Sequence, residues 1–226
     1  MRIRFLQDLR YKLMEREGKK RRKEREAEGK GAAVFPAEPA PAWNILDHKD
    51  KFSSLKTRWE LTKLVRPHGI AAELGVANGV FSDLILRKSN LDYLYSIDMY
   101  GDRKHTVDQY KVALAQLVAH RKRNCILKMK FDEALSLFPD KYFDFIYIDG
   151  FAAKGQDGGS ALHDWYPKIK DGGVFAGHDY ADKWPMTVKA VDDFAHQNKL
   201  KIHTVGGSAD PEDEQNRYAS WFLVRE

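Results

Sequence analysis

Short apolar runs alternate with helical runs through most of this chain. The strand-like runs are residues 70–74, 93–97, 125–129, 143–148 and 173–176, and the helical runs are 79–87, 106–121, 132–137, 160–168 and 186–197. Strands joined through a helix of this length lie parallel, because a crossover needs about a dozen residues. The alternation therefore predicts an α/β fold with a parallel sheet and helices on both faces.

The C-terminal end of the chain breaks this rhythm. Residues 201–205 and 218–224 have strand composition, and the loop between them is rich in glycine and acidic residues and contains no helical run. Two successive strands without a crossover helix pair antiparallel. We therefore expect a mostly parallel seven-stranded sheet that ends with an antiparallel strand.

Charge divides the chain into an N-terminal part and a globular part. The first 30 residues carry 12 Lys and Arg against 6 Asp and Glu, which leaves 26 against 27 in the remainder. We predict a basic arm over 1–31, a Pro- and Ala-rich linker over 32–52, and a domain over 53–226 that begins with a helix at 53–65. A single cysteine, Cys125, excludes an internal disulfide, and no secretory apolar segment is present, so we expect a cytoplasmic protein.

The turn after the first predicted strand has the composition of a nucleoside site. It reads Glu73-Leu74-Gly75-Val76-Ala77-Asn78-Gly79, in which the glycines permit a tight turn and close approach of a ligand. Roughly 20 residues further on, Asp98 ends the next strand, where an acidic side chain can accept hydrogen bonds from ribose hydroxyls.

These motifs resemble those of the class I S-adenosylmethionine-dependent methyltransferases, and the resemblance extends from about residue 59 to residue 224. It implies a Rossmann-like fold, a fourth strand at 143–150 and an adenine contact near 131–135. A carboxylate beside the turn suits a cationic sulfonium better than an anionic pyrophosphate. The implied cofactor-binding residues are Glu73, Gly75, Ala77, Asn78, Gly79, Asp98, Met99, Asp132 and Asp149.

Within that family, residues 149–150 and 170–180 are similar to the small-molecule O-methyltransferases of the catechol and antibiotic-sugar types. This similarity implies a small hydroxylated acceptor, such as a sugar, a glycan terminus or a phenol. It also implies that Asp149, His178 and Asp179 form the catalytic group and hold Mg²⁺. His178 stands where a carboxylate is expected, and imidazole suits magnesium less well than oxygen ligands do. The alternative is metal-free catalysis with His178 as general base, held by Asp179.

Two other functions remain open at the level of sequence. The basic run at 19–25 is compatible with an RNA-modifying or nucleic-acid-binding protein, although the rest of the chain is nearly neutral and lacks an Asn-Pro-Pro-Tyr-like base-methylation motif. The second alternative is a scaffold that binds the cofactor without turnover and whose basic arm contacts an acidic surface. The acceptor and the oligomeric state do not follow from the residues.

Overall fold

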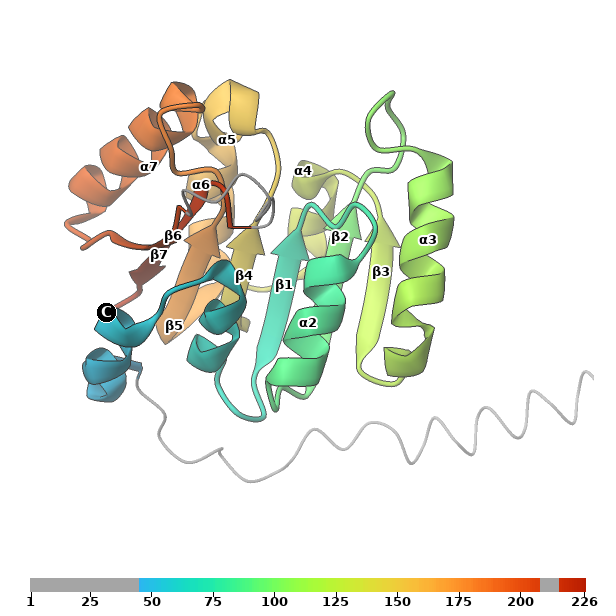
Figure 1. Ribbon diagram of the computed structural model, residues 1–226, viewed down its shortest axis with the longest axis horizontal. Coiled ribbons are helices and arrows are strands. Elements are labelled where there is room, and N and C mark those ends of the chain that lie inside the picture. Colours follow the sequence, from blue (N-terminus) through green and yellow to red (C-terminus); the bar gives the residue numbers. More distant parts are fainter. Residues whose placement is uncertain (1–44, 208–215) are drawn as a thin grey trace, which may run out of the picture. The chain divides into compact units, whose positions relative to one another are not determined.

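The computed structural model describes residues 45–207 and 216–226, and the predicted basic arm lies outside these residues. The described chain forms one seven-stranded sheet in the order β3-β2-β1-β4-β5-β7-β6 (Figure 1). The strands are β1 Ile70–Leu74, β2 Tyr93–Asp98, β3 Asn124–Lys128, β4 Phe143–Ile148, β5 Ile169–Gly177, β6 His203–Gly206 and β7 Ala219–Val224.

Strand directions confirm the predicted fold class. β1 pairs parallel with β2 and β4, β2 pairs parallel with β3, and β4 pairs parallel with β5. β7 lies between β5 and β6 and is antiparallel to both. The sheet is thus Rossmann-like, with one reversed strand near its edge.

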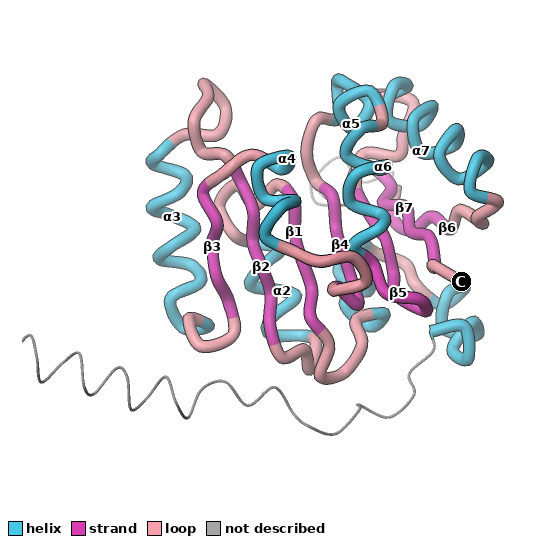
Figure 2. The backbone as a smooth tube through the Cα atoms, turned by 180° about the vertical axis from the view of Figure 1, so that it is seen from behind, coloured by secondary structure: helices cyan, strands magenta, loops and turns pink. Residues whose placement is uncertain are grey.

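Helices cover both faces of the sheet (Figure 2). The longer ones are α2 Val80–Lys88, α3 Val107–Leu117, α6 Ser160–Trp165 and α7 Pro185–Asn198, and the short ones are η3 Val118–His120, α4 Phe131–Ala134, η4 Leu135–Leu137, η5 Ala152–Lys154, α5 Gly155–Gly158 and η6 Tyr166–Lys168. One buried cluster joins α2 and α3 to one face, and another joins α4, α6 and α7 to the opposite face. None of the helices within the described ranges has the length and apolar character needed to cross a membrane.

The burial of the central strand β4 shows why helices must pack on both faces of the sheet. Every residue of β4 is buried. Phe145 and Tyr147 belong to the first cluster, whereas Ile146 and Ile148 belong to the second. Successive side chains of a strand point to opposite faces, so the apolar residues of β4 are all buried only when helices pack on both sides.

The N-terminal edge of the domain differs from the predicted boundary at residue 53. Instead of one helix over 53–65, the chain forms two 3-10 helices, η1 Ile45–Ser54 and η2 Arg58–Leu64. They are separated at Lys56, where the Glu60 carboxylate accepts hydrogen bonds from the backbone N–H groups of Lys56 and Thr57. Ile45 is fully buried in the first cluster. The packed domain therefore includes the end of the predicted linker, because an apolar side chain there completes the core.

Gly177 provides a test of the packing between β5 and β7. A Cβ at this position would lie 2.5 Å from Cζ2 of the Trp221 ring and 2.8 Å from the carbonyl oxygen of Ile148. We expect Gly177→Ala to lower the free energy of unfolding by roughly 1–3 kcal/mol through overpacking. Denaturant unfolding measures this change. Gly101→Ala is the control, because the nearest atom to its Cβ would be 3.5 Å away, and equal stability losses in the two variants would contradict the packing described.

Candidate active site

Three acidic side chains meet where β1, β2 and β4 end. Leu74 at the end of β1 is in register with Ile97 of β2 and with Ile148 of β4. Glu73, Asp98 and Asp149 stand within one residue of these positions. Glu73 and Asp98 are buried, and Asp149 is partly buried. The sheet thus brings together three residues that the sequence predicted for one site.

The glycine turn after β1 has the conformation that its composition predicted. Gly75 has a φ of 95°, and Gly79 has a φ of 81° immediately before α2. A Cβ at Gly75 would collide with the backbone carbonyl oxygen of Asp149. Gly75 is therefore required by the close approach of the β4 end as well as by the turn. Ala77 and Asn78, at the tip of the turn, are exposed.

Asp98 organises this turn through backbone hydrogen bonds. Its Oδ2 accepts from the N–H groups of Val76 at 2.9 Å and Ala77 at 3.0 Å, and its Oδ1 accepts from the N–H of Tyr100 at 3.2 Å. Tyr100, which is fully buried, donates its hydroxyl to the carbonyl oxygen of Ala77 at 2.8 Å. The sequence missed this tyrosine as a support of the turn. The ribose contact of Asp98 remains a prediction.

Among the residues that the structure describes, none donates a cationic hydrogen bond to the Glu73 carboxylate. It is 1% exposed and accepts a hydrogen bond from the Ser82 hydroxyl, which in turn contacts Ser96. Burial raises the pKa of Glu73 to about 8; the Ser82 hydrogen bond opposes the shift, and the negative charge of Asp149 adds to it. At neutral pH this side chain is mainly protonated, and a nearby positive charge would favour its ionised form.

Arg58 supplies a cation that the sequence analysis did not assign to the site. Its side chain comes from η2, is almost completely buried, and donates from Nη2 to Asp149 Oδ2 at 2.9 Å. The guanidinium carbon lies 4.5 Å from the ring centre of Phe81 and 5.4 Å from that of Tyr147. The available signal was an arginine three residues after Leu55 and three before Leu61, on the apolar side of a predicted helix.

His178 follows β5 and faces two carboxylates. Its Nδ1 lies 3.5 Å from Asp149 Oδ1 and 3.3 Å from Asp179 Oδ1. Its Nε2 is buried and has no hydrogen-bond partner among the described residues. The structure thus brings together Asp149, His178 and Asp179, as the sequence predicted.

The two aspartates beside His178 have opposite pKa shifts. Burial alone would raise the pKa of Asp149, but the charge of Arg58 and the proximity of His178 outweigh it, so the pKa lies well below its usual range. Burial raises the pKa of Asp179, His178 opposes that shift, and repulsion from Asp149 adds to it. Asp149 is therefore the stable anion of this group.

Comparison with known proteins shows which family model part of the chain matches. Residues 72–180 match the family model described as a methyltransferase domain. The matched residues include Glu73, Asp98, Asp149 and His178, so the candidate site lies within the match. No curated protein matches the chain.

Solved structures that are similar to this chain share its fold at low sequence identity. An rRNA methylase from Streptococcus thermophilus has a TM-score of 0.56 at 10% identity and covers 83% of this chain and 99% of its own. A candidate O-methyltransferase from Klebsiella pneumoniae has a TM-score of 0.56 at 16% identity. The match covers 86% of this chain and 93% of the other. Fibrillarin from Aeropyrum pernix, solved with natively bound S-adenosyl-L-methionine, has a TM-score of 0.51 at 14% identity. That match covers 71% of this chain and 68% of the fibrillarin chain. Such identities establish the fold alone.

The residues of the site fit S-adenosylmethionine, the cofactor that the match to a methyltransferase domain implies. Of the three acidic side chains at this edge, only Asp149 is paired with Arg58. Asp98, and Glu73 once it is ionised, therefore leave an excess of negative charge for a cationic sulfonium nucleoside. Two further predicted residues border this edge: Met99 is partly buried after β2, and Asp132 is exposed at the start of α4. Next to Asp132, the Phe131 ring lies 3.0 Å from the place of a Cβ on Gly150 and contacts the Phe151 ring edge-on.

The predicted magnesium ligands converge but fit magnesium poorly. Asp149, His178 and Asp179 each offer one atom, and these atoms lie within 4.8 Å of one another. However, one oxygen of Asp149 is bound by Arg58, and the set includes an imidazole nitrogen, whereas magnesium prefers oxygen ligands. No catalytic step is therefore assigned to a metal ion.

The glycine-dense loop after β4 forms a fixed turn beside α7. Gln156 and Asp157 have φ values of 55° and 57°, a left-handed conformation that costs energy for residues other than glycine. Thr187 of α7 donates its hydroxyl to the carbonyl oxygen of Ala152 at 2.8 Å and holds the loop in place. The loop therefore packs against the start of α7.

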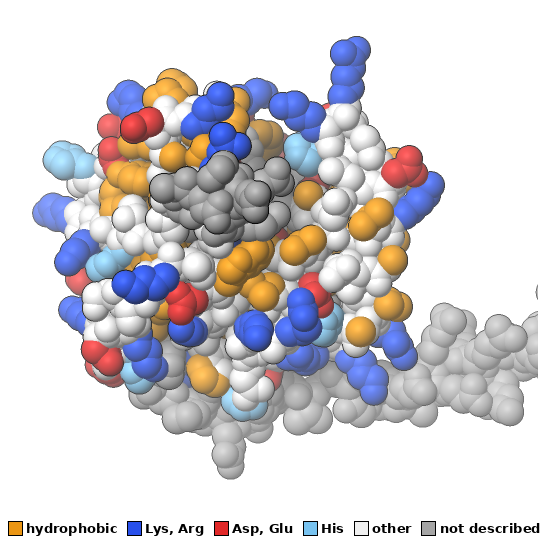
Figure 3. All heavy atoms as spheres, viewed as in Figure 1, with side chains coloured by type: hydrophobic (Ala, Val, Ile, Leu, Met, Phe, Trp, Pro, Cys, Tyr) orange, Lys and Arg blue, Asp and Glu red, His pale blue; other side chains and the backbone are white. Residues whose placement is uncertain are grey.

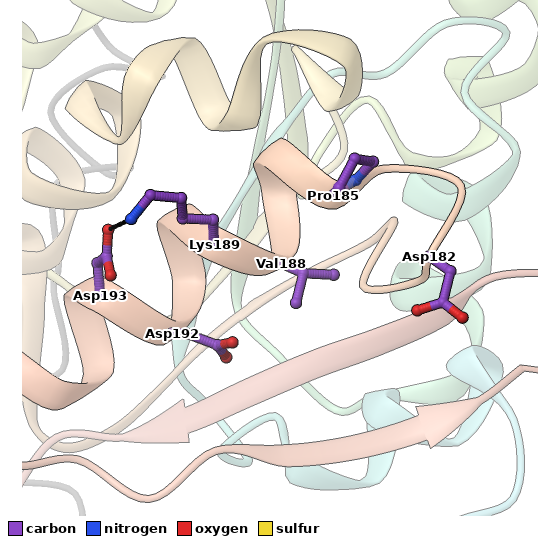
Figure 4. A pocket seen from close by; sticks show the side chains of 6 residues that line it. All are labelled: Asp182, Pro185, Val188, Lys189, Asp192 and Asp193. Atoms are coloured by element: carbon purple, nitrogen blue, oxygen red, sulfur yellow. Dashed lines mark hydrogen bonds and ion pairs between the residues drawn. The ribbon is translucent and has the colours of Figure 1, made fainter.

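Two surface cavities lie apart from these residues. The first, of about 340 Å³, is bordered by α7 and the segment before it; Figure 4 shows Lys189 reaching Asp193 across its wall. The second, of about 470 Å³, lies between η1 and β6. Neither is lined by Glu73, Asp98, Asp149 or His178, so the candidate site is defined by its converging side chains.

Glu73 gives a test of the buried charge. Between its ordinary pKa of 4.5 and its folded pKa of about 8, the folded state holds a proton that the unfolded state has lost, so stability falls as pH rises through this range. Glu73→Gln mimics the protonated form. We expect it to raise the free energy of unfolding above pH 8 by roughly 2–5 kcal/mol relative to wild type, and by little near pH 4.

Unfolding at several pH values measures this difference. A constant offset between Glu73→Gln and wild type over the whole range would contradict the raised pKa. The exposed Glu133 lies outside the cluster of carboxylates, so Glu133→Gln serves as the control and should show no such trend.

Proposed function

We propose that this protein is an O-methyltransferase that acts on a hydroxyl of a small molecule or sugar, with His178 as general base. The observation that carries the proposal is the orientation of the His178 ring. Nδ1 faces the carboxylates of Asp149 and Asp179, while Nε2 is buried and has no partner among the described residues.

The two carboxylates favour the imidazole tautomer that carries its proton on Nδ1. That tautomer leaves the lone pair on Nε2, which is the atom that can accept a proton from an acceptor. Asp149 stays ionised because Arg58 holds its pKa low, so it can also stabilise the imidazolium that forms. This division of roles follows the general scheme of a base oriented by a carboxylate.

The chemistry requires such a base because a neutral hydroxyl is a weak nucleophile. When bound, S-adenosylmethionine supplies an electrophilic methyl group on a sulfonium. His178 Nε2 removes the acceptor's hydroxyl proton as the methyl group moves to the acceptor oxygen and the carbon–sulfur bond breaks. The sulfonium charge is lost with that bond, and the positive charge ends on His178, where Asp149 and Asp179 offset it.

The acceptor site is expected beside the carboxyl ends of the strands, as in other open α/β sheets. This position is beside Asp149 and His178. An RNA acceptor gains less support, since the Lys and Arg side chains on the face of the molecule drawn in Figure 3 are scattered and do not gather over one element. The fold of the rRNA methylases shown by the comparisons does not distinguish the acceptor.

His178 and Asp149 are the residues to test. We expect His178→Asn and Asp149→Asn to lower turnover by roughly 100-fold or more, because the general base is removed or loses its orientation. Binding of S-adenosylhomocysteine, measured by calorimetry, should change little in His178→Asn. His196→Asn is the matched control, since His196 is exposed near the end of α7.

The assay uses a panel of phenols, catechols, sugars and glycans, with S-adenosylhomocysteine release as the readout. Full activity in both variants would refute the assignment of the base. Methyl transfer to RNA with none to the hydroxyl panel would replace the proposed acceptor class.

A further inference from the structure

The site contains a cation of its own. We infer that Arg58 takes the place, beside Asp149, that a divalent metal ion has in the metal-dependent O-methyltransferases that the sequence resembles, so that methyl transfer here needs no metal. This inference rests on the proposed function and adds to it the chemistry of the acceptor site.

Arg58 divides the Asp149 carboxylate between two partners. Oδ2 accepts from Arg58 Nη2 at 2.9 Å, whereas Oδ1 faces His178 Nδ1 at 3.5 Å. With one oxygen fixed by the guanidinium, the plane of the carboxylate is set, and the other oxygen stays directed at the imidazole. Arg58 is therefore a positioning residue that acts on His178 through Asp149.

Several contacts keep the guanidinium in this place. It lies against the rings of Phe81 at 4.5 Å and of Tyr147 and Trp59 at 5.4 Å each. Its own backbone N–H donates to Asn216 Oδ1 at 2.8 Å, which ties η2 to the start of the segment leading into β7. The residue is 5% exposed, so there is little room for the side chain to turn away.

A fixed guanidinium opposes a second cation at Asp149. Arginine does not lose its proton in proteins, so its charge is permanent. A divalent ion bound to Asp149 would stand next to that charge in a buried environment, where repulsion is poorly screened. The positive charge that Asp149 needs is already present, and it forms part of the fold.

The positions of the three potential ligand atoms predict what happens when Arg58 is removed. Asp149, His178 and Asp179 place one potential ligand atom each within 4.8 Å of the others. Two carboxylates and an imidazole are a suitable donor set for a transition metal such as Mn²⁺. Removal of Arg58 leaves this group without its counter-charge, so the variant is expected to acquire a metal site that the wild-type protein lacks.

The experiment compares wild type with Arg58→Met, Arg58→Lys and, as control, Arg87→Met, whose arginine is exposed on α2. Mn²⁺ binding is measured by electron paramagnetic resonance on the full chain, without acceptor. Wild type and Arg87→Met should leave free Mn²⁺ unchanged, whereas Arg58→Met should bind it. Asp149→Asn in the Arg58→Met background should abolish that binding.

Turnover is measured in parallel with EDTA and with added Mg²⁺ or Mn²⁺. Wild-type kcat should be the same in all conditions. Arg58→Met should lose roughly 100-fold in kcat through misplacement of His178, with the KM for S-adenosylmethionine changed far less. Arg58→Lys retains a cation and should recover part of that loss.

Stoichiometric Mn²⁺ binding by wild type, or EDTA-sensitive activity restored by Mg²⁺, would overturn the inference, as would wild-type kcat in Arg58→Met. If Arg58→Met does not fold, as judged by circular dichroism, the wild-type metal titration and Arg58→Lys still decide the outcome. If no hydroxyl acceptor is methylated, the proposed function fails, but the Mn²⁺ measurement still tests the role of Arg58.

Discussion

The site depends on an imbalance of buried charge at one edge of the sheet. The ends of three strands bring Glu73, Asp98 and Asp149 together. Arg58, a buried cation, forms an ion pair with Asp149. Removing several carboxylates from water is costly unless each is neutralised or hydrogen-bonded. Here each is handled differently: Asp98 by backbone N–H groups, Asp149 by the guanidinium, and Glu73 by keeping its proton.

The topology explains why these groups meet. β1 is flanked by β2 on one side and β4 on the other, so the strand order reverses direction beside it. The helices that follow β1 and β4 pack on opposite faces of the sheet, which is the arrangement beside which open α/β sheets bind their ligands. Gly75 lets the two strand ends approach, because a side chain there would collide with the backbone of Asp149. The close approach of the β1 and β4 ends at Gly75 is therefore needed both for the fold and for the site.

Much of this arrangement could be predicted from sequence because it lies in local patterns. The alternation of strand-like and helical runs gave the sheet and its reversed strand, and the turn from Glu73 to Gly79 gave the position of the site. Arg58 and Tyr100 were not predicted, since their roles come from contacts with residues distant in sequence. Ile45 was not predicted to belong to the core, because it follows a proline-rich segment and the few apolar residues beside it are too short a run to show a period.

The most direct test of this account is the number of protons released when S-adenosylmethionine binds. Calorimetric titrations at pH 7, repeated in buffers of different ionisation enthalpy, give this number for wild type and for Glu73→Gln. Because Glu73 has a pKa of about 8, it is mainly protonated beforehand, and a cationic ligand beside it should expel that proton. The account predicts a release in wild type that is absent from the variant. Equal release in both proteins, or no heat of binding at all, would contradict it.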